Sequence, residues 1–191
     1  MAGQQRPVAA DAWTERVLEE LIRTVAAVPG AALEAVAGQI GGARRVYVAG
    51  AGRSGLMMRA FAMRLMHLGF EAHVAGETVT PGIGEGDLLV IGSGSGTTGS
   101  LLRMAEKAKG VGARLALLTT AADSDIGQLA DVTVPIPAAA KEQRGSSKSV
   151  QPMGSLFEQS LLLTLDAVVL KLMEAGSVDA RAMMARHANL E

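Results

Sequence analysis

Four or five short apolar runs, with helical patterns between most of them, restrict the fold of this chain more than any other feature. They cover residues 46–49, 72–75, 88–91, 115–118 and 132–136. A strand that is buried on both faces is apolar throughout, and alternation with helices favours right-handed crossovers between parallel strands. The pattern predicts a doubly wound, three-layer α/β/α sandwich.

Helical patterns occupy residues 54–68, 98–110 and 124–130, and Asp11 is suited to capping a helix whose apolar positions begin at Trp13. At 191 residues the chain suits a single domain with its own core. We expect the domain 1–191 to comprise N-terminal helices at 11–40, an α/β core at 44–136, a surface loop at 138–152 and a long C-terminal helix at 155–175.

The charge balance argues against a nucleic-acid partner. The formal net charge is -1, and neither basic nor acidic residues form a block. Nucleic-acid binding normally requires a positive stripe, and an aromatic content of 3% offers few surfaces for base stacking.

The chain contains no cysteine, which excludes disulfides and thiolate chemistry and fits a reducing compartment. Its first residues lack the order of charges and apolar residues of a signal peptide. The longest stretch without Asp, Glu, Lys or Arg, residues 88–102, is too short and too rich in Gly and Ser to span a bilayer. We therefore expect a cytoplasmic protein without a membrane partner.

The first glycine-rich turn, Gly50-Ala51-Gly52-Arg53-Ser54-Gly55, follows the first apolar run and opens a helix. With Glu77 further along, it formally matches a dinucleotide-binding fingerprint. More generally, glycines let backbone N–H groups approach an anion at a helix N-terminus. Gly52, Arg53 and Ser54 are therefore candidate ligands of a phosphate or an oxyanion, although a tight structural turn explains the glycines as well.

The second glycine-rich loop, residues 93–98, carries four hydroxyls at Ser93, Ser95, Thr97 and Thr98. It follows a buried run and precedes a helix, a place where N–H and O–H donors together suit a compact dianion. The loop lacks the Gly-Lys-Ser/Thr ending of a Walker loop. Since parallel sheets bind ligands beyond the carboxyl ends of their strands, one sugar phosphate is expected to contact both loops.

Longer stretches resemble a known family. Gly-Arg-Ser-Gly and Ser-Gly-Ser-Gly-x-Thr are similar to the sugar isomerase (SIS) domain, whose fold is flavodoxin-like or Rossmann-like. Four further segments resemble the 6-phospho-3-hexuloisomerases. They are Ala-Phe-Ala-Met-Arg-Leu-Met-His-Leu-Gly-Phe at 60–70, the 76–81 segment, Gln-Pro-Met-Gly-Ser-Leu-Phe-Glu-Gln at 151–159 and the ending at 186–191. The likeness covers nearly the whole chain from about residue 12.

The resemblance implies an isomerase, an intramolecular oxidoreductase that interconverts 3-hexulose 6-phosphate and fructose 6-phosphate through a 2,3-enediol(ate). It places the reaction in the ribulose monophosphate pathway of formaldehyde fixation, with functional coupling to a 3-hexulose-6-phosphate synthase. It also implies a five-stranded parallel sheet and a homotetramer with active sites near subunit interfaces. The chemistry needs no metal or other cofactor, and the sequence suggests no metal site, because His67, His73 and His187 are far apart and there is no thiolate.

The reaction requires a base, a donor for the oxygens and a phosphate anchor. Glu158 is the preferred base on the resemblance, although by pattern alone Ser155-x-x-Glu158 is more simply a capping box. The resemblance makes His67 catalytic in a neighbouring subunit's site, with His187 as its rival.

Arg53 is expected to stabilise the enediolate. Glu77 is equally suited to binding sugar hydroxyls and to being an exposed loop acid.

Three other functions fit parts of the sequence. A related SIS isomerase acting on arabinose 5-phosphate or a heptose phosphate would use the same loops. A non-catalytic sugar-phosphate sensor would keep Ser93, Ser95 and Thr98 without needing Glu158. A nicotinamide-binding domain ranks last because the chain has no spare length for a substrate domain.

Overall fold

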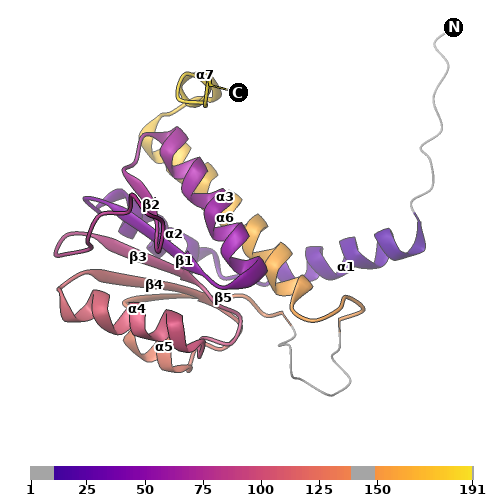
Figure 1. The fold of residues 1–191 in the computed structure, drawn as a ribbon. Coiled ribbons are helices and arrows are strands. Elements are labelled where there is room, and N and C mark those ends of the chain that lie inside the picture. The colour runs from indigo at the N-terminus through magenta and orange to yellow at the C-terminus, as the bar shows by residue number, and fades with distance from the viewer. Residues whose placement is uncertain (1–10, 139–148, 191) are drawn as a thin grey trace, which may run out of the picture.

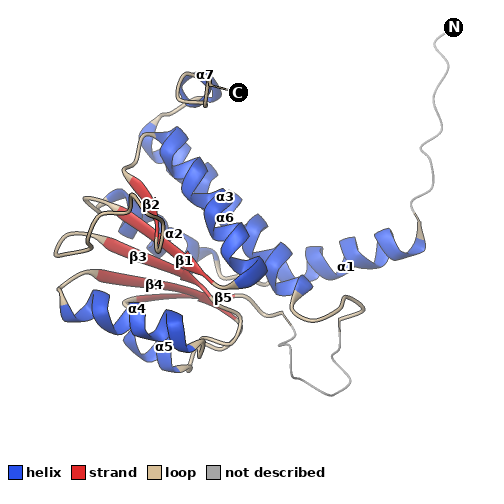
Figure 2. Cartoon of the chain, viewed as in Figure 1, coloured by secondary structure: helices blue, strands red, loops and turns tan. Residues whose placement is uncertain are grey.

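The computed structural model describes residues 11–138 and 149–190, which form one parallel sheet with helices on both faces (Figures 1 and 2). The strands are β1 (Val46–Gly50), β2 (Ala72–Val74), β3 (Leu88–Gly92), β4 (Arg114–Thr119) and β5 (Val132–Pro135). The helices are α1 (Ala12–Ala26), α2 (Gly30–Gly41), α3 (Gly52–Leu68), α4 (Gly99–Gly110), α5 (Asp125–Leu129), α6 (Ser155–Gly176) and α7 (Ala180–Met184). The predicted five-stranded α/β/α sandwich is confirmed.

In the strand order β2-β1-β3-β4-β5 all strands are parallel, and the direction in which successive strands are added to the sheet changes between β1 and β3. Alternate residues of each strand enter different cores because a strand has a period of two. Val46 and Val48 pack with α2, α3 and α6, whereas Tyr47 and Ala49 pack with α4 and α5. Both faces of β1 and β3 are therefore buried.

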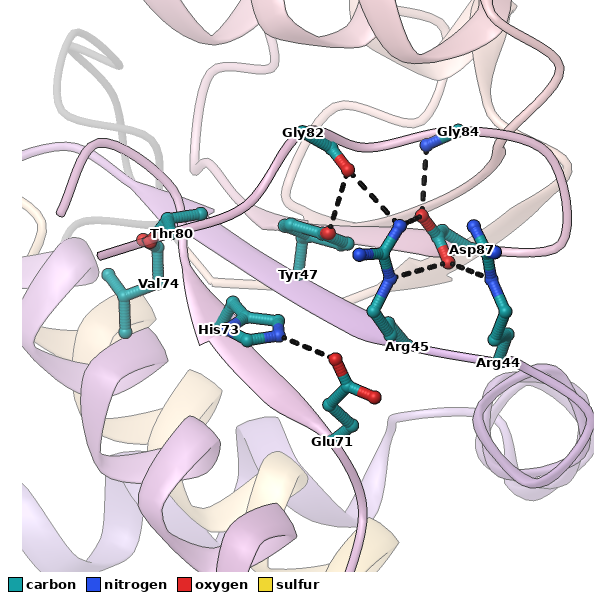
Figure 3. Close-up of polar contacts among 10 residues, drawn as sticks. All are labelled: Arg44, Arg45, Tyr47, Glu71, His73, Val74, Thr80, Gly82, Gly84 and Asp87. Atoms are coloured by element: carbon teal, nitrogen blue, oxygen red, sulfur yellow. Dashed lines mark hydrogen bonds and ion pairs between the residues drawn. The ribbon is translucent and has the colours of Figure 1, made fainter. Parts of the chain in front are cut away.

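The connection from β2 to β3 contains no helix, so a loop crosses the α4 side of the sheet (Figure 3). The buried Asp87 accepts hydrogen bonds from Arg44, Arg45 and the Gly84 N–H, while the Tyr47 hydroxyl donates to the Gly82 carbonyl at 3.1 Å. Burial alone would raise the pKa of Asp87, but the hydrogen bonds from the two arginines lower it to about 2. The loop is thus held by a charged anchor at the start of β3.

Helix α1 begins after Asp11, whose carboxylate accepts from the Trp13 N–H as expected of a cap. It projects away from the sheet (Figure 1), and Trp13, Leu18 and Ile22 are half or more exposed. The described residues of one chain therefore leave the apolar face of α1 largely uncovered. No described helix is by itself long and apolar enough to cross a membrane, and only the bent pair α1–α2 passes that test of length and composition.

Where it is described, the expected surface loop at 138–152 is exposed only in part, at Val150 and Pro152. Ala138 and Gln151 are both buried, and Gln151 is hydrogen-bonded to a residue of α1. Residues 139–148 lie outside the described part of the chain. The short helix α7 has no counterpart among the predicted elements.

Candidate active site

The two glycine-rich loops leave the carboxyl ends of β1 and β3, which are neighbours in the sheet. Gly50 and Gly92 are paired in the register of these strands. Loops that diverge at such a switch point leave a crevice for a ligand. The structure therefore brings together the two loops that the sequence predicted to share one site.

The 93–98 loop is held by the fold so that part of its polar surface faces outward. Ser93 is buried, and its hydroxyl accepts from the Gly96 N–H at 3.2 Å. The Gly94 carbonyl accepts from the Thr119 and Thr120 hydroxyls. Gly96 has φ +64, and a side chain there would collide with Ser124. The loop is thus shaped before any ligand arrives.

Three hydroxyls of this loop remain for a ligand. Ser95 and Thr97 are exposed, and Thr98 is the N-cap residue of α4 without using its side chain as a cap. The Ser95 oxygen accepts weakly from the Thr97 N–H at 3.3 Å. Because the first N–H groups of a helix have no intrahelical partner, an anion can bind at this end of α4.

The 50–55 turn packs α3 closely on the sheet. A Cβ at Gly55 would lie 2.6 Å from the Gly50 carbonyl oxygen, so this glycine is required by close approach. Gly52 opens the helix with φ +54, and Ser54 is half-buried in its first turn. The glycines of this turn thus have a structural role, and Arg53 at its start is free to face α6.

Arg53 joins the two helices that carry the predicted chemistry. Its Nη1 donates to the Ser155 hydroxyl at 2.9 Å and to Glu158 Oε2 at 3.0 Å. The Arg53 side chain is 47% exposed, whereas the Glu158 side chain is 8% exposed, so solvent reaches the cation but hardly reaches the acid. The acid is therefore held in a fixed position beside a cation that solvent reaches.

The capping-box interpretation of Ser155-x-x-Glu158 is wrong. Helix α6 begins after Gly154, which has no side chain to cap it, and Ser155 is already its first residue. Both polar side chains turn to Arg53 instead. Sequence reasoning missed this role of Ser155, although the S-x-x-E pattern had marked the residue.

His67 and His187, treated as rivals from the sequence, lie together at the other end of α3. Their rings stack with centroids 5.3 Å apart, and His67 is 3% exposed. Arg64 approaches His67 Nδ1 at 3.4 Å, and since an arginine only donates, the proton of the neutral ring belongs on Nε2. Burial, followed by the charges of Arg64 and His187, lowers the pKa of His67.

This histidine pair is remote from Arg53 within one chain. His67 follows Arg53 by 14 positions along α3, which is about 21 Å at 1.5 Å per residue. Among the described residues, Glu77 is not hydrogen-bonded to either glycine-rich loop. It pairs with Arg59 beside a groove of about 330 Å³ along α3 and β2. Glu77, the acid that the dinucleotide-binding fingerprint requires, is thus already paired with Arg59.

A cavity of about 450 Å³ lies on the α4 side, where the β2–β3 loop replaces a helix. Its lining includes Tyr47, Leu89, Met104, Arg103 and Lys107, and none of the predicted site residues. Within residues 11–138 and 149–190, no group of three or more His, Asp or Glu side chains is placed to hold a metal ion.

Known proteins are similar to this chain over most of its length. The SIS domain family matches residues 39–163. The 3-hexulose-6-phosphate isomerase of Bacillus subtilis (strain 168) is 49% identical over 180 residues, which cover 94% of this chain and 97% of that protein. The enzyme of the same name from Mycobacterium gastri is 50% identical over 175 residues, covering 92% and 88%.

A crystal structure of a Methanococcus jannaschii protein, for which the function of 3-hexulose-6-phosphate isomerase was inferred, has a TM-score of 0.77 and 34% identity. The match covers 93% of this chain and 96% of that one. The family match and these relatives thus agree with the observed fold. This chain belongs to the SIS domain family, among the relatives of the 3-hexulose-6-phosphate isomerases.

Proposed function

We propose that this protein is a 3-hexulose-6-phosphate isomerase, which converts 3-hexulose 6-phosphate to fructose 6-phosphate. The observation that carries the proposal is the contact of Arg53 with Glu158 beside the 93–98 loop, in a chain about half identical to enzymes of that name. The ribulose monophosphate pathway and coupling to a synthase follow from that substrate.

The chemistry requires a proton to leave C2 and another to reach C3 while the carbonyl moves from C3 to C2. Glu158 is the proposed base for C2, and its carboxylic acid then returns a proton to C3. Arg53 is the proposed donor that stabilises the negative charge of the 2,3-enediolate, because its guanidinium is accessible and already oriented. No metal or other cofactor has a step in this scheme.

The phosphate is proposed to bind at the start of α4. Ser95, Thr97 and Thr98 supply hydroxyls and the helix supplies backbone N–H groups. Ser93 shapes the loop through Gly96, while Ser54 and Gly52 border the ligand from the neighbouring turn. Glu77, paired with Arg59, is proposed to meet the sugar hydroxyls only at the edge of the site.

A role for His67 requires a second subunit, because its own chain holds it about 21 Å from Arg53 along α3. We propose that the histidine pair moves oxygen-bound protons in a neighbouring site, with the more exposed His187 at the surface. A homotetramer would also cover apolar side chains that one chain leaves exposed. They include Trp13, Leu18, Ile22, Leu56, Met63, Met66, Leu163 and Leu170.

We also propose that residues 1–191 form one SIS domain of a cytoplasmic enzyme. Every described strand belongs to one sheet, which supports a single domain. The methionines of α3 fit both a role in the core and a role in the proposed subunit interface. Met58 is buried in the core, whereas Met63 and Met66 are exposed on the outer face.

The test uses the purified protein with 3-hexulose 6-phosphate, and fructose 6-phosphate is followed by a coupled enzyme. In a second experiment, fructose 6-phosphate in D₂O should lose its C3 proton signal in the NMR spectrum. Loss of the C1 proton instead would indicate an aldose–ketose isomerase. Binding without turnover of any of these sugars, including arabinose 5-phosphate, would indicate a sensor and overturn the proposal.

A further inference from the structure

Glu20 is a buried carboxylate far in sequence from the proposed catalytic residues. It lies on α1, where the only buried side chains are Glu20 and Thr24. Glu20 is 7% exposed, although most of α1 is in contact with solvent. A buried carboxylate is costly unless its oxygens are hydrogen-bonded, so its partners indicate its role.

Within the described part of the chain, the hydrogen bonds to the Glu20 carboxylate come from three consecutive residues before α6. The Ser149 hydroxyl donates to Oε2 at 2.6 Å, the Val150 N–H to Oε1 at 2.7 Å and the Gln151 amide to Oε2 at 3.1 Å. Burial alone would raise the pKa of Glu20, but these donors outweigh it and lower the pKa. The ionised Glu20 carboxylate therefore holds residues 149–151 in place through hydrogen bonds.

The clamped segment leads directly to Ser155 and Glu158. Only three residues separate Gln151 from Ser155, and among them Met153 has φ 56, which is unfavourable for a residue with a side chain. Helix α6 has no side-chain cap to determine where it starts. The position of its first turn is thus set by the segment that Glu20 holds.

We propose that Glu20 is a positioning residue for catalysis, holding the start of α6 so that Ser155 and Glu158 meet Arg53. The inference rests on the proposed function for its catalytic part. Since a small misplacement of a reacting group reduces the rate strongly, Glu20→Ala should lower kcat about 10- to 100-fold. KM should change little, because the described hydrogen bonds of Glu20 go to residues 149–151 and not to the 93–98 loop.

The experiment compares Glu20→Ala and Glu20→Gln with Glu19→Ala, a matched variant of the exposed neighbouring glutamate. Glu20→Gln should fall between the wild type and Glu20→Ala, because its amide keeps an acceptor but adds a donor opposite Gln151. Glu19→Ala should retain wild-type kcat. Wild-type kcat in Glu20→Ala would overturn the proposal.

A double-mutant cycle separates positioning from simple loss of stability. If Glu20 acts through Glu158, then adding Glu20→Ala to Glu158→Gln should reduce kcat no further. A fully additive reduction would contradict the proposal.

Amide hydrogen exchange gives a readout that does not need activity. In Glu20→Ala, exchange should increase at residues 150–158 and stay unchanged in β1 and β3. An equal increase throughout the sheet would mean general destabilisation and would overturn the proposal. If the wild type fails to isomerise 3-hexulose 6-phosphate, the function fails, while this measurement still decides whether Glu20 positions α6.

Discussion

The two ends of α3 carry different chemistry. At its first turn, Arg53 is open to solvent and is hydrogen-bonded to Ser155 and Glu158 of α6. At its last turn, His67 is buried as a neutral ring under His187. Figure 1 shows α3 and α6 side by side over their length, with α7 beyond the end that carries His67.

The two ends of α3 therefore differ in whether a second subunit is needed for a role in catalysis. In the proposed mechanism, a cation beside a carboxylate at the strand ends provides proton abstraction and charge stabilisation within one chain. A buried imidazole at the far end contributes to the same reaction only if another subunit brings the ends together. The following experiments, from the largest expected effect to the smallest, test that division.

Glu158→Gln should cause the largest loss at the Arg53 end. Removing the base should lower kcat about 1,000-fold, because general-base catalysis contributes about 10²–10⁴-fold. Steady-state kinetics with 3-hexulose 6-phosphate measures this effect. Glu174→Gln, an exposed glutamate near the other end of α6, serves as the control. Full activity in Glu158→Gln would exclude this carboxylate as the base.

Arg53→Lys should lower kcat about 100-fold, in the range found for loss of an oxyanion donor. Lysine keeps the positive charge but replaces the planar guanidinium, whose Nη1 donates to both Ser155 and Glu158, with a compact, strongly hydrated ammonium. Kinetics of this variant beside Arg59→Lys, which changes an exposed arginine on the same helix, measures the effect. Equal losses in the two variants would contradict a specific role for Arg53.

His67→Gln should lower kcat about 10- to 100-fold if the histidine transfers protons in a neighbouring site. Mixing this variant with Glu158→Gln subunits should then restore activity well above that of either alone, since some mixed sites contain both native residues. The measurement is the activity of the mixture after subunit exchange. No recovery in demonstrably mixed oligomers would confine His67 to a structural role.

The pH dependence of stability is the smallest effect and tests the buried state of His67. Because its pKa is lowered in the folded protein, the unfolded chain binds the proton first as the pH falls. Stability from this residue is complete above the unfolded-state pKa of about 6.5 and decreases below it. Urea unfolding at pH 7.5 and 5.5 should therefore show a larger decrease for the wild type than for His67→Gln.

Local sequence patterns predicted the helices, strands and turns well, because the formation of these elements depends on residues that are close in sequence. The apolar runs became strands, Asp11 became a cap, and the glycine-rich loops lie at strand ends as expected. The buried Glu20 had no comparable signal. In sequence it differs little from Glu15 and Glu19 of the same helix, and only the packing of α1 against the segment before α6 buries it.

The sequence by itself determined the α/β alternation and the two loops, since hydrophobic periodicity and glycine act over a few residues. Only the tertiary structure decided the strand order, the partner of Glu158 and the pairing of His67 with His187. Arg53 and Glu158 are 105 positions apart, and no local preference encodes a contact over that separation. It arises because α3 and α6 pack together on one face of the sheet, where burial of their apolar sides brings the polar ends into contact.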